Sequence, residues 1–464
     1  MKDNKNINRK SFFKVFGGLA ATSATLAYGC KPKNQTVLTE GALSLSDISP
    51  EKMEYRINPH TRDKVSLLGY GCMRLPMHQK SETEEKIDQD TWNDLVDAAL
   101  EKGINYFDTS PAYGRGLSER ATGIALSRHS RNQYFIATKL SNFRPETFSR
   151  EASIAMYRNS FKELQIDYID YYLLHGVGLG GMENLEIRYL NNKVLDFLLK
   201  EREDGRIRNL GWSFHGDVKV FDYLLATGIK WDFVQIQMNY VDWKHASGWN
   251  VNAEYLYNEL SKHHIPVVVM EPLLGGRLSK IPTFIAGKLK EQRPESSIAS
   301  WAFRYAGSYP DVLTVLSGMT YKEHLIDNLH TFSPLTPVSD KEEKLLEEVA
   351  QMILKYPLIS CTECRYCMPC PYGIDIPEIF AHYNRCVNEG NYPQSKQDEN
   401  YRKARRAFLI GYDRSVPKLR QASHCINCGK CRSLCPQKID IPEEMNRINN
   451  FAEQLKQGTL PETI

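Results

Sequence analysis

Eight of the eleven cysteines in this 464-residue chain lie in two short runs near its C-terminus. The runs read Cys361-x2-Cys364-x2-Cys367-x2-Cys370-Pro371 and Cys425-x2-Cys428-x2-Cys431-x3-Cys435-Pro436. Three thiolates two residues apart can surround one cubane cluster, and in two-cluster ferredoxins the fourth Cys, before Pro, binds the other cluster. The pattern therefore predicts two [4Fe-4S] clusters with these eight cysteines as ligands.

Structural zinc and disulfides are the other uses of crowded cysteines. Zinc sites usually place two C-x-x-C pairs roughly 12 to 20 residues apart, and neither run has that form. Disulfide-dense chains are small, and cysteines this close cannot all pair without strain. One point stays open: the first run has two residues before its last Cys, so Cys386 is an alternative ligand to Cys370.

The middle of the chain alternates short β-rich runs with longer amphipathic ones, which is typical of parallel βα units. Eight strands are predicted, at Val65–Leu75, Ile104–Ser110, Tyr134–Leu140, Ile169–Gly176, Arg208–His215, Phe233–Asn239, Pro266–Leu273 and Val312–Gly318. Helices are predicted between them at Thr91–Lys102, Glu151–Leu164, Lys193–Asp204, Ala253–His263 and Ser296–Ala306. The sequence thus predicts an α/β fold, a (β/α)8 TIM barrel, followed by a small, mainly helical ferredoxin-like domain.

The N-terminus has a different character. A basic stretch precedes an apolar, small-residue run from Val15 to Gly29 and then Cys30, which indicates an export signal. The run is shorter than the roughly 20 residues that span a bilayer. Residues 9–14 resemble a twin-arginine signal with its second Arg replaced by Lys10, and residues 27–30 resemble a lipoprotein box. We expect an exported protein, periplasmic or anchored by a lipidated Cys30; if the segment is only a disordered tail, the protein is cytoplasmic.

The overall charge excludes one class of partner. The formal net charge is +3, and Lys and Arg are interspersed with Asp and Glu. This balance does not suggest a nucleic-acid partner.

Four polar side chains stand at or just after the ends of successive predicted strands. Asp108 ends the second strand, Tyr113 lies in the loop after it, Lys139 ends the third and His175 ends the fourth. In a (β/α)8 barrel these strand ends meet at one mouth, where catalytic residues gather. We therefore expect these four side chains to form one site, although each also has an ordinary structural explanation.

The four residue types suit carbonyl reduction. A phenol has a pKa of about 10, and a nearby ammonium lowers it, so we expect Lys139 to lower the pKa of Tyr113. Asp108 would keep Lys139 charged, and His175 would donate a hydrogen bond to the substrate oxygen. Tyr113 would then deliver or remove the proton.

The segments around these residues resemble the aldo/keto reductase family over roughly residues 67–328. The matching motifs are Gly103-Ile104-Asn105-Tyr106-Phe107-Asp108-Thr109-Ser110, Tyr113-Gly114-Arg115-Gly116-Leu117-Ser118-Glu119, Ala137-Thr138-Lys139-Leu140, Tyr171-Tyr172-Leu173-Leu174-His175 and Gly205-Arg206-Ile207-Arg208-Asn209-Leu210-Gly211-Trp212-Ser213. The resemblance implies that Asp108, Tyr113, Lys139 and His175 are the catalytic tetrad. It also implies a nicotinamide cofactor, NAD(P), bound in extended form without a Gly-rich Rossmann loop.

By the same resemblance, eight residues would contact the cofactor: Ser213, Gln235, Pro272, Leu273, Ser317, Gly318, Lys322 and Asn328. Three positions depart from the family pattern. Phe214 replaces an expected Asn, Met270 replaces an aromatic that stacks on nicotinamide, and Thr320 replaces a basic residue for the 2′-phosphate, for which Lys322 could substitute. NAD, NADP or loss of nicotinamide use therefore all remain open.

The first cysteine run resembles the C-terminal part of aldo/keto reductases with an appended cluster domain. The predicted organisation is an export signal (residues 1–30), a linker (31–50), the barrel (51–338) and a dicluster domain (339–464). Nicotinamide gives up two electrons as hydride, whereas a cluster accepts one, and a flavin is the usual converter. Either a redox partner protein supplies a flavin, the barrel holds one, or the clusters are structural. An electron-transfer subunit with the barrel as a docking scaffold is the rival interpretation.

The substrate cannot be named, because specificity loops vary freely on this fold. Residues 176–192 and 243–250, after the fourth and sixth predicted strands, are expected to line its pocket. Trp243 and Trp249 could stack on a ring of the substrate or simply pack in the protein.

Overall fold

Eight parallel strands close into a barrel in this computed structural model, which describes residues 44–79, 85–248 and 250–462. The order around the barrel is β10-β11-β12-β3-β6-β7-β8-β9. The bounds are β3 (Leu68–Gly71), β6 (Tyr106–Asp108), β7 (Phe135–Leu140), β8 (Ile169–Val177), β9 (Ile207–Phe214), β10 (Phe233–Gln237), β11 (Val267–Met270) and β12 (Val312–Ser317). Each coincides with a predicted strand, so the (β/α)8 prediction is confirmed.

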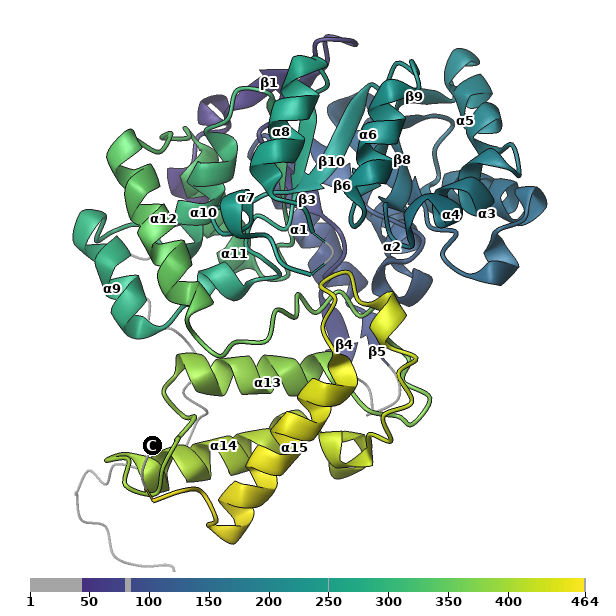
Figure 1. Ribbon diagram of the computed structural model, residues 1–464. Helices are drawn as coiled ribbons and strands as arrows, with labels where there is room; N and C mark the ends of the chain where they lie inside the picture. Colours follow the sequence, from purple (N-terminus) through teal and green to yellow (C-terminus); the bar gives the residue numbers. More distant parts are fainter. Residues whose placement is uncertain (1–43, 80–84, 249, 463–464) are drawn as a thin grey trace, which may run out of the picture. The chain divides into compact units, whose positions relative to one another are not determined.

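Helices cover the outside of the barrel (Figure 1). One follows each strand: α1 (Gln89–Glu101), α2 (Ser118–Leu126), α3 (Arg150–Leu164), α5 (Val194–Glu203), α6 (Val218–Ala226), α8 (Ala253–Lys262), α10 (Ile298–Gly307) and α11 (Lys322–Phe332). Extra helices lie in the connecting loops: α4 (Gly181–Leu185), η7 (Glu186–Leu190), α7 (Asp242–His245) and α9 (Thr283–Gln292). The five predicted helices all form.

Side chains rather than a channel fill the barrel interior. The interior cluster contains Val65, Tyr106, Ala137, Tyr171, Leu173, Phe233, Val268, Leu313 and Leu316. Because side chains alternate along a strand, the next inward residue after Tyr106 is Asp108, and after Ala137 it is Lys139. The same alternation carries β8 from Leu173 to His175. Polar groups therefore begin where the packed interior ends, at the carboxyl ends of the strands.

Two hairpins lie outside the barrel sheet. The first is β1 (Tyr55–Ile57) with β2 (Lys64–Ser66), and the second is β4 (Met77–Gln79) with β5 (Glu85–Ile87). After β1, the Asn58 amide donates to the Tyr171 hydroxyl (3.2 Å) and the Asn209 side chain (3.3 Å). These contacts attach the first hairpin to the barrel strands.

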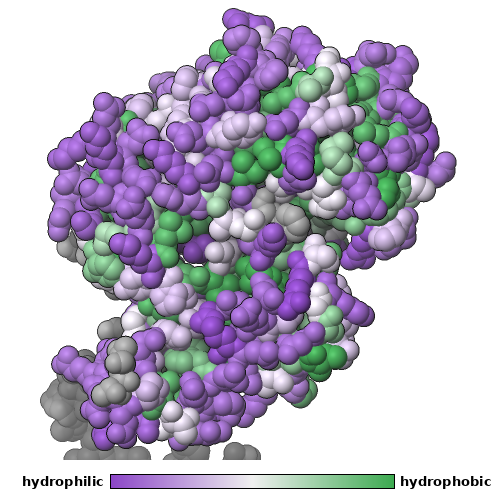
Figure 2. All heavy atoms as spheres, viewed as in Figure 1, coloured by the Kyte–Doolittle hydropathy of each residue, from purple (hydrophilic) through white to green (hydrophobic). Residues whose placement is uncertain are grey.

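The C-terminal domain has a hydrophobic core of its own. Its helices are α13 (Ile376–Asn388), α14 (Tyr401–Ser415) and α15 (Ile441–Gln457), and its core runs from Ile359 to Leu460. The preceding helix α12 (Asp340–Leu354) packs instead with the barrel core, through Leu346, Val349 and Ile353. Figure 2 shows apolar side chains in the indentation between the barrel and the C-terminal domain.

Short helical turns complete the described chain: η2 (Leu45–Asp47), η3 (Pro50–Lys52), η4 (Tyr113–Gly116), η5 (Arg131–Gln133), η6 (Pro145–Thr147), η8 (Arg277–Ser279), η9 (Lys418–Arg420), η10 (Ala422–His424) and η11 (Arg432–Leu434). None of the helices in the described residues is long and apolar enough to cross a membrane. The predicted export signal and the lipidation site at Cys30 lie outside the described residues.

Candidate active site and cluster sites

The structure brings the four strand-end residues together at the carboxyl end of the barrel. Asp108 and Lys139 form a buried ion pair, with Lys139 Nζ 2.5 Å from Asp108 Oδ1 and 3.0 Å from the Thr109 carbonyl. Burial lowers the pKa of Lys139, and burial raises the pKa of Asp108. Each charge in this apolar setting therefore depends on the other.

Tyr113 lies directly above this pair. Lys139 Nζ is 5.0 Å from the centroid of the Tyr113 ring, and the rings of Tyr113 and His175 are 5.8 Å apart. Among the residues that the structure describes, none forms a hydrogen bond with the Tyr113 hydroxyl. Burial, followed by the nearby Tyr366 phenol, raises the pKa of Tyr113 well above its usual value. The predicted lowering by Lys139 is therefore wrong, because desolvation outweighs the ammonium.

His175 is fixed from both ring nitrogens. Its Nδ1 lies 2.6 Å from the Ser141 hydroxyl, which also contacts the Ser110 hydroxyl at 2.8 Å. Its Nε2 lies 3.1 Å from the hydroxyl of Tyr366. Burial, together with the nearby charges of Lys139 and Arg188, lowers the pKa of His175 well below its usual value. A neutral imidazole that accepts from Ser141 at Nδ1 carries its proton on Nε2, pointing toward Tyr366.

The loop after β8 supports His175 from behind. Arg188 donates from Nη2 to the His175 carbonyl (2.6 Å) and from Nε to the Asn142 carbonyl (3.1 Å). Its guanidinium lies 4.9 Å from the centroid of the Phe143 ring, which in turn lies 4.8 Å from the His175 ring. Residues 176–192, which were expected to line the pocket, thus place at least Arg188 against the site.

Tyr366 is the site residue that the sequence did not reveal. It stands between Cys364 and Cys367, and its ring lies 5.7 Å from that of Phe143. A Tyr inside a cysteine run looks like any other spacer residue. Only the folded chain shows that the first run reaches the barrel mouth, where its phenol meets His175, 191 positions earlier in the chain.

The predicted cofactor contacts belong to β9, β10 and β12 or to the segments that follow β11 and β12. Ser213 accepts a hydrogen bond from the Gly176 amide (2.9 Å), and the Asn328 amide donates to Ser317 Oγ (2.7 Å). Pro272 and Leu273 form the turn after β11, Gly318 follows β12, and Lys322 is exposed at the start of α11. Six of the eight residues thus lie at or within five residues of a strand end, whereas Gln235 lies within β10 and Asn328 within α11.

Gln235 supplies the most direct sign that these residues can hold a carboxamide. Its Nε2 lies 3.4 Å from Asp108 Oδ2, whereas its Oε1 is buried without a hydrogen-bond partner among the described residues. A buried acceptor of this kind is costly unless a donor reaches it. The amide N–H of nicotinamide is a suitable donor, so the residues present fit the cofactor that the resemblance implies.

The cysteines gather into two groups, each drawn from both runs. Cys361, Cys364, Cys367 and Cys435 line one pocket, which we call the proximal group because it adjoins the barrel mouth. Burial raises the pKa of Cys364 to about 12, with Glu271 and then Cys435 as charged neighbours. The last Cys of the second run thus crosses to the first, as the Cys-Pro spacing predicts.

The second, distal group contains Cys370, Cys425, Cys428 and Cys431. Burial raises the pKa of Cys431 to about 11, and the other three thiols are its charged neighbours. Cys386, the alternative to Cys370, lies instead on α13 with its sulfur 3.5 Å from His382 Nε2. All ten cysteines of the described residues are free, so none of them forms a disulfide.

Two glycines of the barrel seat the cluster domain. A Cβ added at Gly275 would clash with the backbone of Thr362, which follows Cys361, and one at Gly248 would clash with the backbone of Gln437, close after Cys435. Arg74 joins the first contact by donating to the carbonyls of Gly275 (3.1 Å) and Thr362 (2.6 Å). The segments that flank the proximal group therefore rest directly on the loops around the barrel mouth.

Replacing Gly275 by Ala is expected to weaken this docking. Gly275 and Gly205 both have positive φ, +69° and +79°, but an added Cβ meets nothing within 4 Å at Gly205. Gly205→Ala is therefore the matched control, costing about 1 to 2 kcal/mol for the left-handed backbone alone. In chemical denaturation of the cluster-loaded protein, Gly275→Ala should lower the free energy of unfolding clearly more than the control. Equal losses would show that the contact is unimportant.

Two tryptophans after the sixth predicted strand, Trp243 and Trp249, were expected to stack on a substrate ring or to pack in the protein. Trp243 is buried against Tyr309, with ring centroids 4.6 Å apart, and against Tyr257 at 5.9 Å. Packing thus accounts for Trp243. Trp249 lies outside the described residues, whereas Asn250 next to it donates to the Gln437 side chain (3.0 Å).

Comparison with known proteins agrees with both parts of the chain. Residues 67–351 match the family described as "Aldo/keto reductase family", and residues 360–440 match "4Fe-4S dicluster domain". The chain is 25% identical over 320 residues to the uncharacterized oxidoreductase YqkF of Bacillus subtilis, covering 63% of this chain and 95% of that protein. It is 30% identical over 163 residues to L-galactose dehydrogenase of Arabidopsis thaliana, covering 34% of this chain and 48% of that protein.

Solved structures share the barrel. The holo form of aldo-keto reductase AKR11C1 from Bacillus halodurans superposes with a TM-score of 0.52 at 24% identity, covering 64% of this chain and 96% of that one. An aldo-keto reductase from Klebsiella pneumoniae in complex with NADPH gives a TM-score of 0.50 at 20% identity, covering 64% and 95%.

Proposed function

Since the chain belongs to the aldo/keto reductase family and carries a 4Fe-4S dicluster domain, we propose that it interconverts a carbonyl group and an alcohol at Asp108, Tyr113, Lys139 and His175. The observation that carries this proposal is the assembled site: a buried Asp108–Lys139 pair beside a phenol whose hydroxyl has no hydrogen-bond partner among the described residues, next to a neutral imidazole. This arrangement supplies a proton donor, a cation to stabilise the phenolate left behind, and a hydrogen-bond donor for the reacting oxygen.

The proton steps follow from the positions of these groups. The raised pKa keeps Tyr113 protonated at neutral pH, so its hydroxyl can donate to the carbonyl oxygen as that oxygen becomes a hydroxyl. Lys139 stabilises the phenolate, and Asp108 holds Lys139 in place. His175 Nε2 orients the same oxygen. In the direction of alcohol oxidation, Tyr113 removes the proton instead.

Ser213, Gln235, Pro272, Leu273, Ser317, Gly318, Lys322 and Asn328 would hold the nicotinamide cofactor, which when bound supplies or accepts the hydride. Support comes from the Gln235 oxygen, which has no hydrogen-bond partner among the described residues, and from the origin of all eight residues in β9 to β12 or the segments that follow β11 and β12. Lys322 is exposed at the start of α11 and remains available to a 2′-phosphate, whereas the Thr320 hydroxyl already donates to the Arg74 carbonyl (2.8 Å).

Nucleotide binding tests this proposal without a known substrate. Anaerobically purified protein should bind NADPH or NADH, measured by quenching of protein fluorescence, and Gln235→Leu should weaken binding about 10-fold, because it removes the acceptor for the carboxamide. The control is Lys219→Ala, which changes an exposed lysine on α6 and should leave nucleotide binding unchanged. Absence of binding by both nucleotides, with clusters intact, would contradict nicotinamide use.

We further propose that the protein holds two [4Fe-4S] clusters, a proximal one on Cys361, Cys364, Cys367 and Cys435 and a distal one on the other four cysteines. Two groups of four thiols, each joined from both runs, support that count. The clusters would relay electrons between the barrel site and a redox partner protein. A flavin is the usual converter between hydride and single electrons, and it would have to act at the barrel end of this relay, between the nicotinamide and the proximal cluster.

A second candidate function has one specific observation in its favour. The Tyr366 phenol already contacts His175 Nε2, the group expected to orient the substrate oxygen. A barrel held closed in this way could serve as a scaffold for an electron-transfer subunit. This candidate predicts reducible clusters and partner binding together with no nucleotide binding, so the same titration separates the two.

We also propose that the chain is exported and attached to a membrane by lipid on Cys30. The basic and apolar pattern of the first 30 residues supports this location. A tightly held cofactor and preformed clusters would suit the twin-arginine route, which carries folded proteins.

A further inference from the structure

The segment from Tyr401 to Lys438, which spans α14 and the second cysteine run, is strongly basic. It contains ten Lys and Arg residues and one acid, Asp413, although the whole chain has a net charge of only +3. The rest of the chain is therefore net acidic. The whole-chain balance conceals this asymmetry, because a charge average over two domains says little about either.

Most of these cations have no carboxylate partner within the described residues. Arg420 pairs with Asp375 and Arg432 with Asp440, and Arg405 donates to the carbonyls that end α15. The remaining exposed cations form no ion pair with any residue that the structure describes: Arg402, Lys403, Arg406, Arg414, Lys418 and Lys430. Their charge is thus available to a partner.

Four exposed apolar side chains lie close in the sequence to cysteines of the distal group, three of them in this basic segment and Tyr372 before it. Tyr372 is 46% exposed, Leu419 79%, Ile426 58% and Leu434 49%. Tyr372 lies two residues after Cys370, and Ile426 lies next to Cys425. Leu419 joins them because the Lys418 carbonyl contacts the ring of His424, beside Cys425, at 3.1 Å. Single exposed apolar residues are ordinary, whereas four of them within a few positions of the distal cysteines or of a residue that contacts this segment point to an interaction surface.

We propose that these four apolar residues, with Lys418 and Lys430, form the docking surface for a small acidic electron-carrier protein. This inference rests on the relay that we proposed above and names its outer end. An apolar centre with a charged rim is the usual anatomy of a protein interface, and a basic rim selects an acidic partner. Each encounter would move one electron between the carrier and the distal cluster, one being oxidised as the other is reduced, with no proton transferred.

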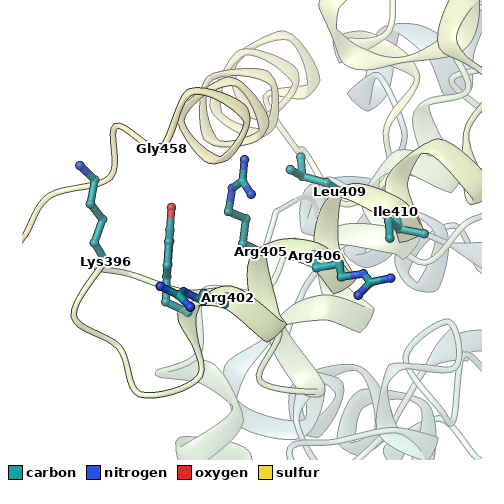
Figure 3. Close-up of a pocket in the computed structure, with 8 residues that line it drawn as sticks. Lys396, Arg402, Arg405, Arg406, Leu409, Ile410 and Gly458 are labelled. Atoms are coloured by element: carbon teal, nitrogen blue, oxygen red, sulfur yellow. The ribbon is translucent and has the colours of Figure 1, made fainter.

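A basic pocket beside α14 adds to the positive electrostatic potential of this part of the protein. Figure 3 shows Lys396, Arg402, Arg405 and Arg406 around it, with Leu409 and Ile410 on one side. Its charged lining residues are all cations. Such a field raises the rate of encounter with an acidic protein and weakens as salt is added.

The test uses the full-length, cluster-loaded protein and an acidic plant-type [2Fe-2S] ferredoxin as the probe. Isothermal titration calorimetry should show binding that weakens with salt, and Lys418→Glu with Lys430→Glu should raise Kd at least about tenfold. The matched control reverses two exposed lysines of the barrel, Lys219 and Lys288, and should leave Kd unchanged. Leu419→Ser should weaken binding at constant charge. Cytochrome c, a basic carrier, should not bind.

Two outcomes would overturn the proposal. One is equal binding by the Lys418/Lys430 and Lys219/Lys288 variants. The other is no ferredoxin binding together with Lys418- and Lys430-dependent binding to phosphatidylglycerol vesicles but not phosphatidylcholine vesicles, which would make this a membrane-binding surface. Electron paramagnetic resonance of dithionite-reduced protein tests the proposed relay separately from the docking surface. Reducible clusters without ferredoxin binding would reject the docking surface but not the relay.

Discussion

Tyr113→Phe is expected to lower kcat about 10²- to 10⁴-fold, the usual contribution of a positioned proton donor, while the iron content and the fold stay unchanged. The change removes only the hydroxyl, and that hydroxyl forms no hydrogen bond with another described residue. No structural contact is therefore lost with it. The measurement is steady-state reduction of a panel of aromatic aldehydes under anaerobic conditions, with iron content and circular dichroism as checks on folding.

Tyr366→Phe is the matched control, because it removes the other phenol beside His175. Its hydroxyl competes with the substrate oxygen for His175 Nε2 and donates no proton in the proposed reaction. KM should therefore fall about 3- to 10-fold, the value of one hydrogen bond, with kcat little changed. If Tyr366→Phe abolished turnover and Tyr113→Phe did not, the roles assigned to the two phenols would be reversed.

The second large effect concerns cluster loading. Cys435→Ala should lower the iron content from about eight to about four atoms per chain, because it removes a ligand of one four-iron cluster. The affected cluster should be the one held by Cys361, Cys364 and Cys367, although these residues belong to the other run. Cys386→Ala, a buried thiol outside both groups, should retain all the iron.

Double variants identify which cysteines share a cluster. Cys361→Ala added to Cys435→Ala should remove no further iron, since both serve the proximal group. Cys425→Ala added to Cys435→Ala should remove nearly all of it, because Cys425 belongs with Cys370 and Cys431. If the four cysteines of each run bound one cluster instead, Cys425→Ala added to Cys435→Ala would remove no further iron, and Cys361→Ala added to Cys435→Ala would remove nearly all of it. Iron analysis and electron paramagnetic resonance of the reduced protein distinguish these two arrangements.

The sequence was most informative where one local rule applies. Alternation along β6, β7 and β8 sends Asp108, Lys139 and His175 inward at the strand ends, so their meeting could be predicted without knowing the packing. Cys-Pro spacing likewise predicted the crossing of Cys435, whereas the short spacing before Cys370 left Cys386 as its alternative. These inferences need only the strand period and the cysteine spacing.

Prediction failed where two distant parts of the chain meet. Tyr366 and Thr362 acquire their roles only when the cluster domain rests on Gly275, and nothing in either segment marks that contact. The pKa of Tyr113 was predicted in the wrong direction for a related reason. A pairwise argument from Lys139 leaves out the burial that the surrounding chain imposes.

The barrel site is built from four side chains that bind no cluster themselves. The contact between Thr362 and Gly275 nevertheless couples this site to the cluster domain, and therefore to the supply of iron. Binding of a metal centre orders the segment that supplies its liganding residues. Here the segment with the first cysteine run also brings Tyr366 to His175. In a cell short of iron, the barrel would be folded but the cysteine segment with Tyr366 would not be held against its carboxyl end. In that state Tyr366 would no longer occupy His175 Nε2, so turnover at low substrate concentration would depend on cluster loading as well as on the amount of protein.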